Sequence, residues 1–101
     1  MLRLILSPEA NDDLEDAFEW LGNQLPGLDD RFLEEVHSAL EQIAGHPYRF
    51  PERFTGIRAA LLRKFQYTIF YEVNETQDVV FVYGILHQAR NSKVLKRRTG
   101  G

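Results

Sequence analysis

Apolar and polar residues alternate at the start of the chain and then change to a helical spacing. Residues 2–6 read Leu-Arg-Leu-Ile-Leu, which predicts a short strand with at least one buried face. Ser7-Pro8 ends this strand, because serine is a good N-cap and proline suits the first helical position. An amphipathic helix is then predicted to end near Gly22-Asn23, and its apolar positions are Ala10, Leu14, Ala17, Phe18 and Leu21.

A second helical pattern follows a short connector, Leu25-Pro26-Gly27. Asp29 and Asp30 near its start favour the positive end of the helix dipole. Gly45-His46-Pro47 is expected to end this helix, and the short connector predicts that the two helices form an antiparallel hairpin. The apolar positions of the second helix are Leu28, Phe32, Val36, Leu40 and Ile43.

Strand-like segments occupy the second half of the chain. Residues 48–56 contain Pro51, Gly56 and several aromatic side chains, and they predict an ordered loop. Three strands are predicted over Ile57–Arg63, Tyr67–Val73 and Val79–Leu86, and the last of them is apolar on both faces, which is typical of a central strand. The residues after His87 predict a short basic helix or a flexible arm, and we expect residues 96–101 to be flexible.

The predicted order is therefore β-α-α-β-β-β in a single domain that covers residues 1–101. Because helices and strands are segregated along the chain, the predicted class is α+β, with the helical hairpin packed on a small, mainly antiparallel sheet. The first strand is expected to pair within that sheet, since so short a strand would not persist alone.

Charge divides the chain into two unlike halves. The net charge is −3, from 15 acids and 12 bases. Residues 1–52 contain 12 acids and 3 bases, whereas residues 53–101 contain 3 acids and 9 bases. This asymmetry indicates different partners for different faces of the molecule, and the negative total makes direct nucleic-acid binding an unfavoured function.

The composition also excludes some classes of protein. The chain has no cysteine, which excludes a disulfide-stapled secreted scaffold. The amino terminus lacks the longer apolar region and the cleavage site of a signal peptide, and no segment approaches the ~18–20 apolar residues that span a bilayer. We therefore expect a cytoplasmic protein.

The residues suited to acid–base or phosphate chemistry lie in the second half of the chain. His87 stands at the end of the last predicted strand, and Arg63 and Arg90 could bind phosphate oxygens, as in a metal-independent ribonuclease. An alternative interpretation is that His87 only ends a strand and that the arginines are solvated. The full cluster is Arg58, Arg63, Lys64, Tyr67, Tyr71, His87 and Arg90.

Other kinds of site find little support in the sequence. The three histidines are far apart and no cysteine is present, so no metal site is expected, and the absence of a glycine-rich phosphate-binding motif predicts no nucleotide cofactor. The acids of the first predicted helix are expected to lie around its solvent-exposed side. Trp20 falls outside the apolar stripe of that helix and is a candidate for a protein interface.

Several segments together resemble the RelE/ParE superfamily of type II toxin–antitoxin toxins. They include Arg63-Lys-Phe-Gln-Tyr-Thr-Ile-Phe-Tyr-Glu-Val and, after a hairpin, Val79-Val-Phe-Val-Tyr-Gly-Ile-Leu-His-Gln-Ala-Arg. The Ser7-Pro-Glu-Ala opening and the Ile43-Ala-Gly-His-Pro run also fit, so the resemblance covers nearly the whole chain. The ending Leu86-His-Gln-Ala-Arg resembles the ParE-like branch, and the tail lacks the C-terminal aromatic residue common in RelE-like nucleases.

The resemblance implies a toxin that inhibits DNA gyrase and is neutralised by a ParD-like antitoxin in a hetero-oligomer, with no cofactor and no metal. A RelE-like ribosome-dependent mRNA endonuclease and an inactive binding module with the toxin fold are the alternatives. Ribosome binding favours a strongly basic domain, and this acidic chain therefore favours the gyrase target.

The resemblance also implies roles for individual residues. Target binding is assigned to His87, Arg90, Lys93, Lys96 and Arg97. Antitoxin binding is assigned to Trp20, Phe32, Arg58 and Arg63. In an endoribonuclease the catalytic residues would be Arg63, Tyr67, His87 and Arg90.

Overall fold

The α+β order expected from the sequence is confirmed in a computed structural model, which describes residues 2–88 and 92–99. Two long helices, α1 (Pro8–Gln24) and α2 (Leu28–Gly45), separate the first strand from the others, and a short helix, α3 (Ser92–Thr99), comes last. The strands are β1 (Arg3–Leu6), β2 (Glu52–Phe54), β3 (Ile57–Leu62), β4 (Tyr67–Asn74) and β5 (Val79–His87).

The strands form one five-stranded sheet in the order β1-β5-β4-β3-β2. Neighbours from β2 to β5 are antiparallel, whereas β1 pairs in parallel with β5. The parallel pair arises because the whole helical hairpin lies between β1 and the meander of the later strands. The prediction that the last strand is central is confirmed, since β5 lies between β1 and β4.

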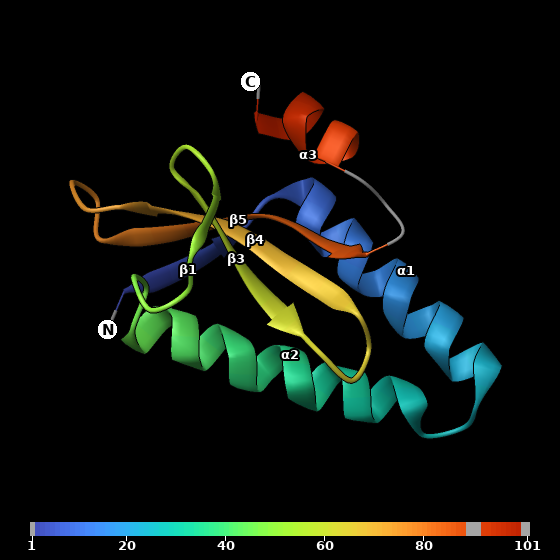
Figure 1. Cartoon of the computed structure of the whole chain (residues 1–101). Helices are drawn as coiled ribbons and strands as arrows, with labels where there is room; N and C mark the ends of the chain where they lie inside the picture. The colour runs from blue at the N-terminus through green and yellow to red at the C-terminus, as the bar shows by residue number, and fades with distance from the viewer. Residues whose placement is uncertain (1, 89–91, 100–101) are drawn as a thin grey trace.

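Helices cover the two faces of the sheet unequally (Figure 1). The hairpin of α1 and α2 packs its apolar stripes on one face, where Phe32, Val36 and Ile43 meet Ile69 and Tyr71 of β4. On the opposite face a smaller apolar cluster of Ile57, Phe70 and Leu86 is in contact with Val94 of α3. The residues of β4 alternate between the two faces, because Ile69 and Tyr71 belong to the first cluster and Phe70 belongs to the second.

Ser7 begins α1 in the way that the Ser-Pro pair predicts. Its hydroxyl oxygen accepts a hydrogen bond from the amide of Ala10 at 3.0 Å, and Pro8 occupies the first turn. The cap satisfies an amide that would otherwise lie buried without a partner.

Replacing Ser7 with alanine is expected to lower the free energy of unfolding by about 1 kcal/mol, since the capping acceptor is lost. Urea denaturation followed by circular dichroism measures the change. Ser38→Ala is the matched control, because Ser38 is exposed within α2 and the same substitution there should change stability by less than about 0.5 kcal/mol. Equal stability of the two variants would contradict a capping role for Ser7.

Two local predictions need correction. The first helix ends at Gln24, one residue beyond Gly22-Asn23, because the amide of Leu25 still bonds to the carbonyl of Leu21 at 3.1 Å. The segment 48–56 also contains the strand β2, which was expected to be loop. This strand of three residues has too few positions to show a period, and it exists through its pairing with β3 around the turn at Gly56, whose φ is +78°.

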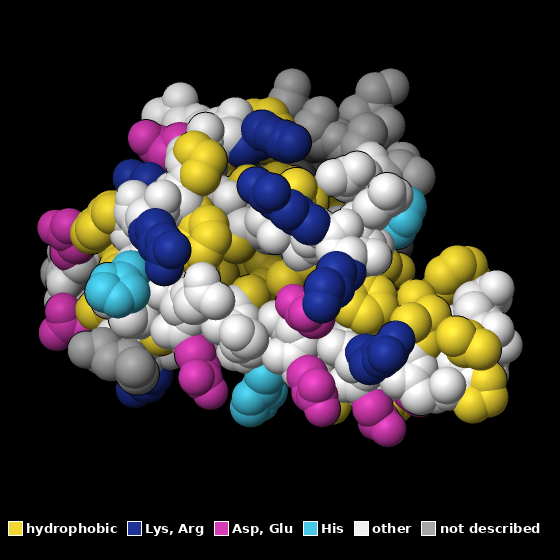
Figure 2. All heavy atoms as spheres, turned by 60° about the horizontal axis from the view of Figure 1, so that its bottom comes forward, with side chains coloured by type: hydrophobic (Ala, Val, Ile, Leu, Met, Phe, Trp, Pro, Cys, Tyr) yellow, Lys and Arg dark blue, Asp and Glu magenta, His cyan; other side chains and the backbone are white. Residues whose placement is uncertain are grey.

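The charge asymmetry of the sequence is visible on the surface. Figure 2 shows Lys and Arg side chains running across the middle of one face, whereas most Asp and Glu side chains lie along its left and lower margins. Basic side chains therefore predominate in the middle of this face and acidic ones toward its margins.

Candidate functional site

A β-bulge in β5 is the starting point of the candidate site. Phe70 of β4 pairs with Gly84, but the next residue, Tyr71, pairs with Val82, so Tyr83 is the extra residue on β5. A bulge removes backbone groups from the regular ladder and redirects them. Here the Tyr83 carbonyl accepts a bond from the Ser7 hydroxyl at 3.4 Å, which joins the bulge to the start of α1.

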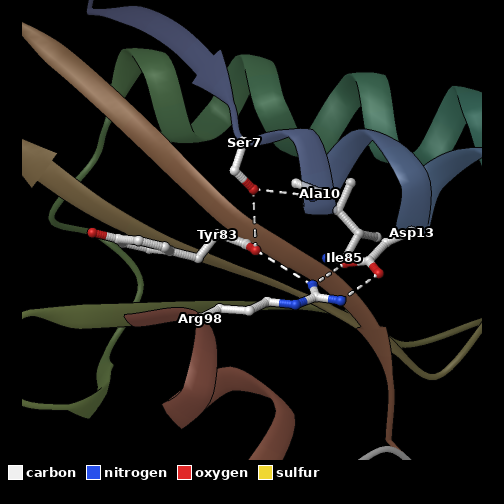
Figure 3. Close-up of polar contacts among 6 residues, drawn as sticks. All are labelled: Ser7, Ala10, Asp13, Tyr83, Ile85 and Arg98. Carbon is white, nitrogen blue, oxygen red and sulfur yellow. Dashed lines mark hydrogen bonds and ion pairs between the residues drawn. The ribbon is translucent and has the colours of Figure 1, made fainter. Parts of the chain in front are cut away.

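A buried ion pair closes over this bulge and holds α3 against the sheet (Figure 3). The Arg98 guanidinium makes two bonds to Asp13, with Nη1–Oδ2 at 2.5 Å and Nη2–Oδ1 at 3.0 Å. Asp13 Oδ2 also accepts from the Ile85 amide at 3.0 Å, and Arg98 donates to the Tyr83 carbonyl at 3.4 Å. We call this group the α3 anchor; it joins the C-terminal helix, β5 and α1.

The environment of the α3 anchor favours its charged form. The side chains of Arg98 and Asp13 are only 16% and 5% exposed. Hydrogen bonds to Asp13 and the nearby negative charges raise the pKa of Arg98, against the opposing effect of burial. Gly84 makes the approach possible, because a Cβ there would lie 2.9 Å from Arg98 Nη1 and 3.3 Å from Asp13 Oδ2.

The position of Asp13 corrects the expectation that the acids of the first helix are all solvated. Asp13 is buried, because it lies three residues after Ala10 and four before Ala17 on the face that packs against β5. This spacing was a usable signal in the sequence, since an acid on an apolar stripe requires a partner. Sequence reasoning missed Arg98 as that partner, because nothing local connects two residues that are 85 positions apart.

Next to the α3 anchor lies a cleft between α1 and the adjoining ends of β4 and β5. Its volume is about 370 Å³, and it is lined by Asp13, Asp16, Ala17, Trp20, Tyr67, Ile85 and His87. We call it the α1–β5 cleft. Tyr67 and His87 are cross-strand partners, and their rings meet edge to face with centroids 5.1 Å apart. Trp20 is 56% exposed, so an aromatic surface is available beside the exposed carboxylate of Asp16.

A second polar cluster organises the loop before β2. Arg58 Nη1 donates to the carbonyls of Tyr48 and Phe50 at 3.3 and 2.7 Å, and its guanidinium lies 5.1 Å from the centre of the Tyr48 ring. Tyr71 is fully buried below this loop, and its hydroxyl donates to the Pro47 carbonyl at 2.6 Å. Arg58 and Tyr71 thus position the segment that leads from α2 into the sheet.

Burial raises the pKa of Tyr71 to about 12, although the nearby Arg58 acts in the opposite direction. An unfolded tyrosine loses its proton near pH 10, so between about pH 10 and pH 12 the unfolded state is deprotonated first and the folded state loses stability. We expect unfolding in urea to become easier over this range, and a Tyr71→Phe variant to show a smaller pH dependence. Identical pH profiles for the two proteins would contradict the prediction.

The sequence itself decides the family of this fold. The family model for the ParE toxin of the type II toxin–antitoxin system parDE matches residues 4–92. The chain belongs to the ParE toxin family. It is therefore a type II toxin–antitoxin toxin with the RelE/ParE fold, and the resemblance noted in the sequence is confirmed. No curated protein sequence gave a significant match.

Solved structures with the same fold come from both branches of the superfamily. The chromosomal ParDE system of P. aeruginosa aligns with a TM-score of 0.73 at 13% identity, over 86% of this chain and 96% of that chain. The isolated E. coli RelE toxin aligns with a TM-score of 0.66 at 19% identity, over 96% of this chain and 98% of that chain. The intact toxin–antitoxin complex RelBE of E. coli aligns with a TM-score of 0.68 at 18% identity, over 89% of this chain and 100% of that chain. At these identities the likeness shows the fold.

Four of the five residues assigned to target binding in this ParE family member lie at the end of β5 or in α3. His87 lines the α1–β5 cleft, and Arg97 is exposed on α3. Lys93 and Lys96 are also in α3, but their side chains lie outside the description, as does the whole of Arg90. Of residues 96–101, which were expected to be flexible, 96–99 form the end of α3, and 100–101 lie outside the described residues.

The residues assigned to RNA cleavage are only partly brought together. Tyr67 and His87 are adjacent in the α1–β5 cleft. Arg63 follows β3, is exposed, and lines a different groove with Lys64 between α2 and β3. Asp13 and Asp16 contribute carboxylates where a phosphate would require cations.

The residues assigned to antitoxin binding differ in their access to a partner. Trp20 and Arg63 are exposed, and Arg58 is partly buried and makes the loop contacts described above. Phe32 is fully buried, where it packs against Phe65 and Tyr67 at centroid distances of 5.4 and 5.0 Å. Direct contact between Phe32 and a partner would therefore require the core to open.

The described residues hold no group of three or more His, Asp or Glu side chains arranged to bind a metal ion. Within the same residues, no helix is both long enough and apolar enough to cross a membrane.

Proposed function

We propose that this ParE-family toxin acts in the cytoplasm by inhibiting DNA gyrase, and that a ParD-like antitoxin neutralises it in a hetero-oligomer. The family model supports this proposal over the RelE-like alternative, because it is the ParE model that matches residues 4–92. The proposed target surface is the end of β5 with α3, where His87 and the exposed Arg97 lie.

The observation that carries the proposal is the chemistry of the α1–β5 cleft. Metal-independent cleavage of RNA requires a positioned acid or base together with cations for the charge that develops on phosphate. The cleft offers Tyr67 and His87, but Asp13 and Asp16 face the same space and Arg63 lies in another groove. Asp16 would repel a phosphate, so this arrangement favours a protein target over an RNA substrate.

A supercoiling assay with purified gyrase tests the target. We expect the wild-type toxin to stop supercoiling, and an Arg97→Ala variant to inhibit more weakly because it removes an exposed charge of α3. Arg53→Ala is the matched control, since Arg53 is equally an exposed arginine but lies in β2. Unhindered supercoiling at high toxin concentration would overturn the gyrase proposal.

Thermal unfolding in the presence of the antitoxin tests neutralisation by a direct complex. A partner at 100 times its Kd stabilises the folded state by about 2.7 kcal/mol, so the Tm should rise clearly. Trp20→Ala should reduce this rise, whereas Leu25→Ala serves as a matched control because both side chains are 56% exposed on the helical hairpin. A Tm that does not change on adding the cognate antitoxin would contradict the proposal.

The contact between Tyr67 and His87 is the one observation that favours an endonuclease instead. That function predicts ribosome-dependent mRNA cuts which disappear in His87→Ala and Arg90→Ala, and intact message in a translating extract would exclude it. If expression of the toxin without its antitoxin caused no growth arrest, the third interpretation, an inactive binding module, would be supported.

A further inference from the structure

We propose that the α1–β5 cleft is a binding site for an arginine side chain presented by a partner protein. Three features converge there: an exposed indole, an exposed carboxylate and the paired rings of Tyr67 and His87. The proposal concerns the chemistry of this cleft and does not depend on gyrase being the target.

The aromatic part of the cleft suits a planar cation. Trp20 is more than half exposed although it is the largest side chain of α1, and it borders the cleft together with Tyr67 and His87. An indole face attracts a cation more strongly than any other aromatic face, and guanidinium groups stack on it in preference to ammonium groups. An exposed tryptophan beside other rings is therefore at least as suitable for binding a cation as for binding an apolar group.

The charged part of the cleft supplies the carboxylate that such a cation requires. Asp16 lines the cleft one turn before Trp20, and it makes no ion pair with any of the side chains that the structure describes. Asp12 and Glu19 are its exposed neighbours on the same helix, at the spacings that place side chains next to one another. No lysine or arginine occurs anywhere in α1, so the helix itself does not neutralise this row of acids.

The α3 anchor shows that this helix already binds a guanidinium group. Asp13, one turn before Asp16, holds Arg98 through two parallel hydrogen bonds. Two parallel bonds from two different nitrogen atoms require a guanidinium group, because an ammonium group has only one nitrogen. Asp16 is a second carboxylate on the same helix, in a more exposed position, and Trp20 adds an aromatic surface beside it. This combination suits an arginine from outside the chain.

The single tryptophan of the protein provides a direct readout. The indole N–H resonance of Trp20 would be followed by NMR while a blocked Ala-Arg-Ala peptide is added at physiological salt. We expect a saturable shift with a Kd on the order of 1 mM, as for one anchored side chain. The same peptide with citrulline in place of arginine should bind at least about tenfold more weakly, and the lysine peptide should fall between them.

Variants at neighbouring positions separate a specific site from general attraction to an acidic helix. Asp16→Asn should weaken binding of the arginine peptide about fivefold, whereas Asp12→Asn should change it by less than about twofold, because Asp12 does not line the cleft. Trp20→Ala should abolish binding and Trp20→Phe should retain part of it, as followed by the ring resonances of His87.

Several outcomes would overturn the proposal. One is the absence of a saturable shift of the Trp20 resonance, and another is equal binding of the arginine and citrulline peptides, which would indicate a purely apolar groove. Equal losses in Asp12→Asn and Asp16→Asn would indicate non-specific attraction, and tighter binding of a short RNA would indicate a nucleic-acid surface. The peptide comparison uses the wild-type chain, so it remains decisive if a variant fails to fold.

Discussion

Replacing Arg98 with alanine is expected to lower the free energy of unfolding by about 3 kcal/mol, because it leaves the buried carboxylate of Asp13 without its counter-ion. The value lies at the lower end of the range for broken buried pairs, since α3 is a short helix and its release lets water reach Asp13. In a domain of about 100 residues this corresponds to a fall in Tm of about 12–24 °C. Calorimetry and urea denaturation both measure it.

Three further variants assign this loss to the ion pair. Arg97→Ala removes an exposed arginine of the same helix and should change stability by less than about 0.5 kcal/mol. Arg98→Lys keeps the charge but not the two parallel bonds, so it should lie between the wild type and Arg98→Ala. In an Asp13→Ala background the effect of Arg98→Ala should shrink, because no buried charge is left unpaired. Equal stability of Arg97→Ala and Arg98→Ala would contradict the role given to the α3 anchor.

Truncating Phe32 to alanine is expected to destabilise the fold by about 3–5 kcal/mol, because it opens a cavity at the centre of the packing between α2 and the sheet. This loss is a large part of the total free energy of unfolding of a small domain, which is roughly 5–15 kcal/mol. Phe32 also packs against Tyr67, which in turn contacts His87, so the rings of the α1–β5 cleft should become more mobile. Urea denaturation gives the stability, and the NMR line widths of His87 report on the cleft.

Leu33→Ala is the matched control for this substitution, because Leu33 is the next residue of α2 and is 37% exposed. Its effect on stability should stay below about 1 kcal/mol. The pair also tests the antitoxin-binding role implied for Phe32. If Phe32→Ala bound the antitoxin poorly while its stability matched that of Leu33→Ala, the residue would act by direct contact. If Phe32→Ala lost both stability and affinity for the antitoxin, Phe32 would act through the packing of the core.

Most of the fold followed from local patterns, for identifiable physical reasons. The Ser7-Pro8 pair predicted the start of α1 because capping involves only neighbouring residues, and the apolar run of β5 predicted a central strand because both of its faces are covered. The strand β2 was missed, since its three residues contain too few positions for a period to be visible. Its formation depends on the edge that β3 offers.

The candidate site was predicted less completely than the fold. Trp20 was correctly expected to lie outside the apolar stripe, and Tyr67 and His87, both singled out in the sequence, do meet. The separation of Arg63 from Tyr67 and His87 could not be predicted. The sequence alone does not show which groove a side chain enters after a strand ends. The burial of Phe32, in contrast, followed directly from its place on the apolar stripe of α2.

By itself the sequence determined the α+β class, the helical hairpin, the central strand, the charge asymmetry and the membership of the ParE toxin family. Each of these depends on periodicity, composition or motifs that are written along a continuous stretch of chain. The tertiary structure alone decided that Asp13 would be buried and paired with Arg98 over the bulge at Tyr83. That pairing depends on strand register and on the room left at Gly84, and both arise only when distant segments pack together.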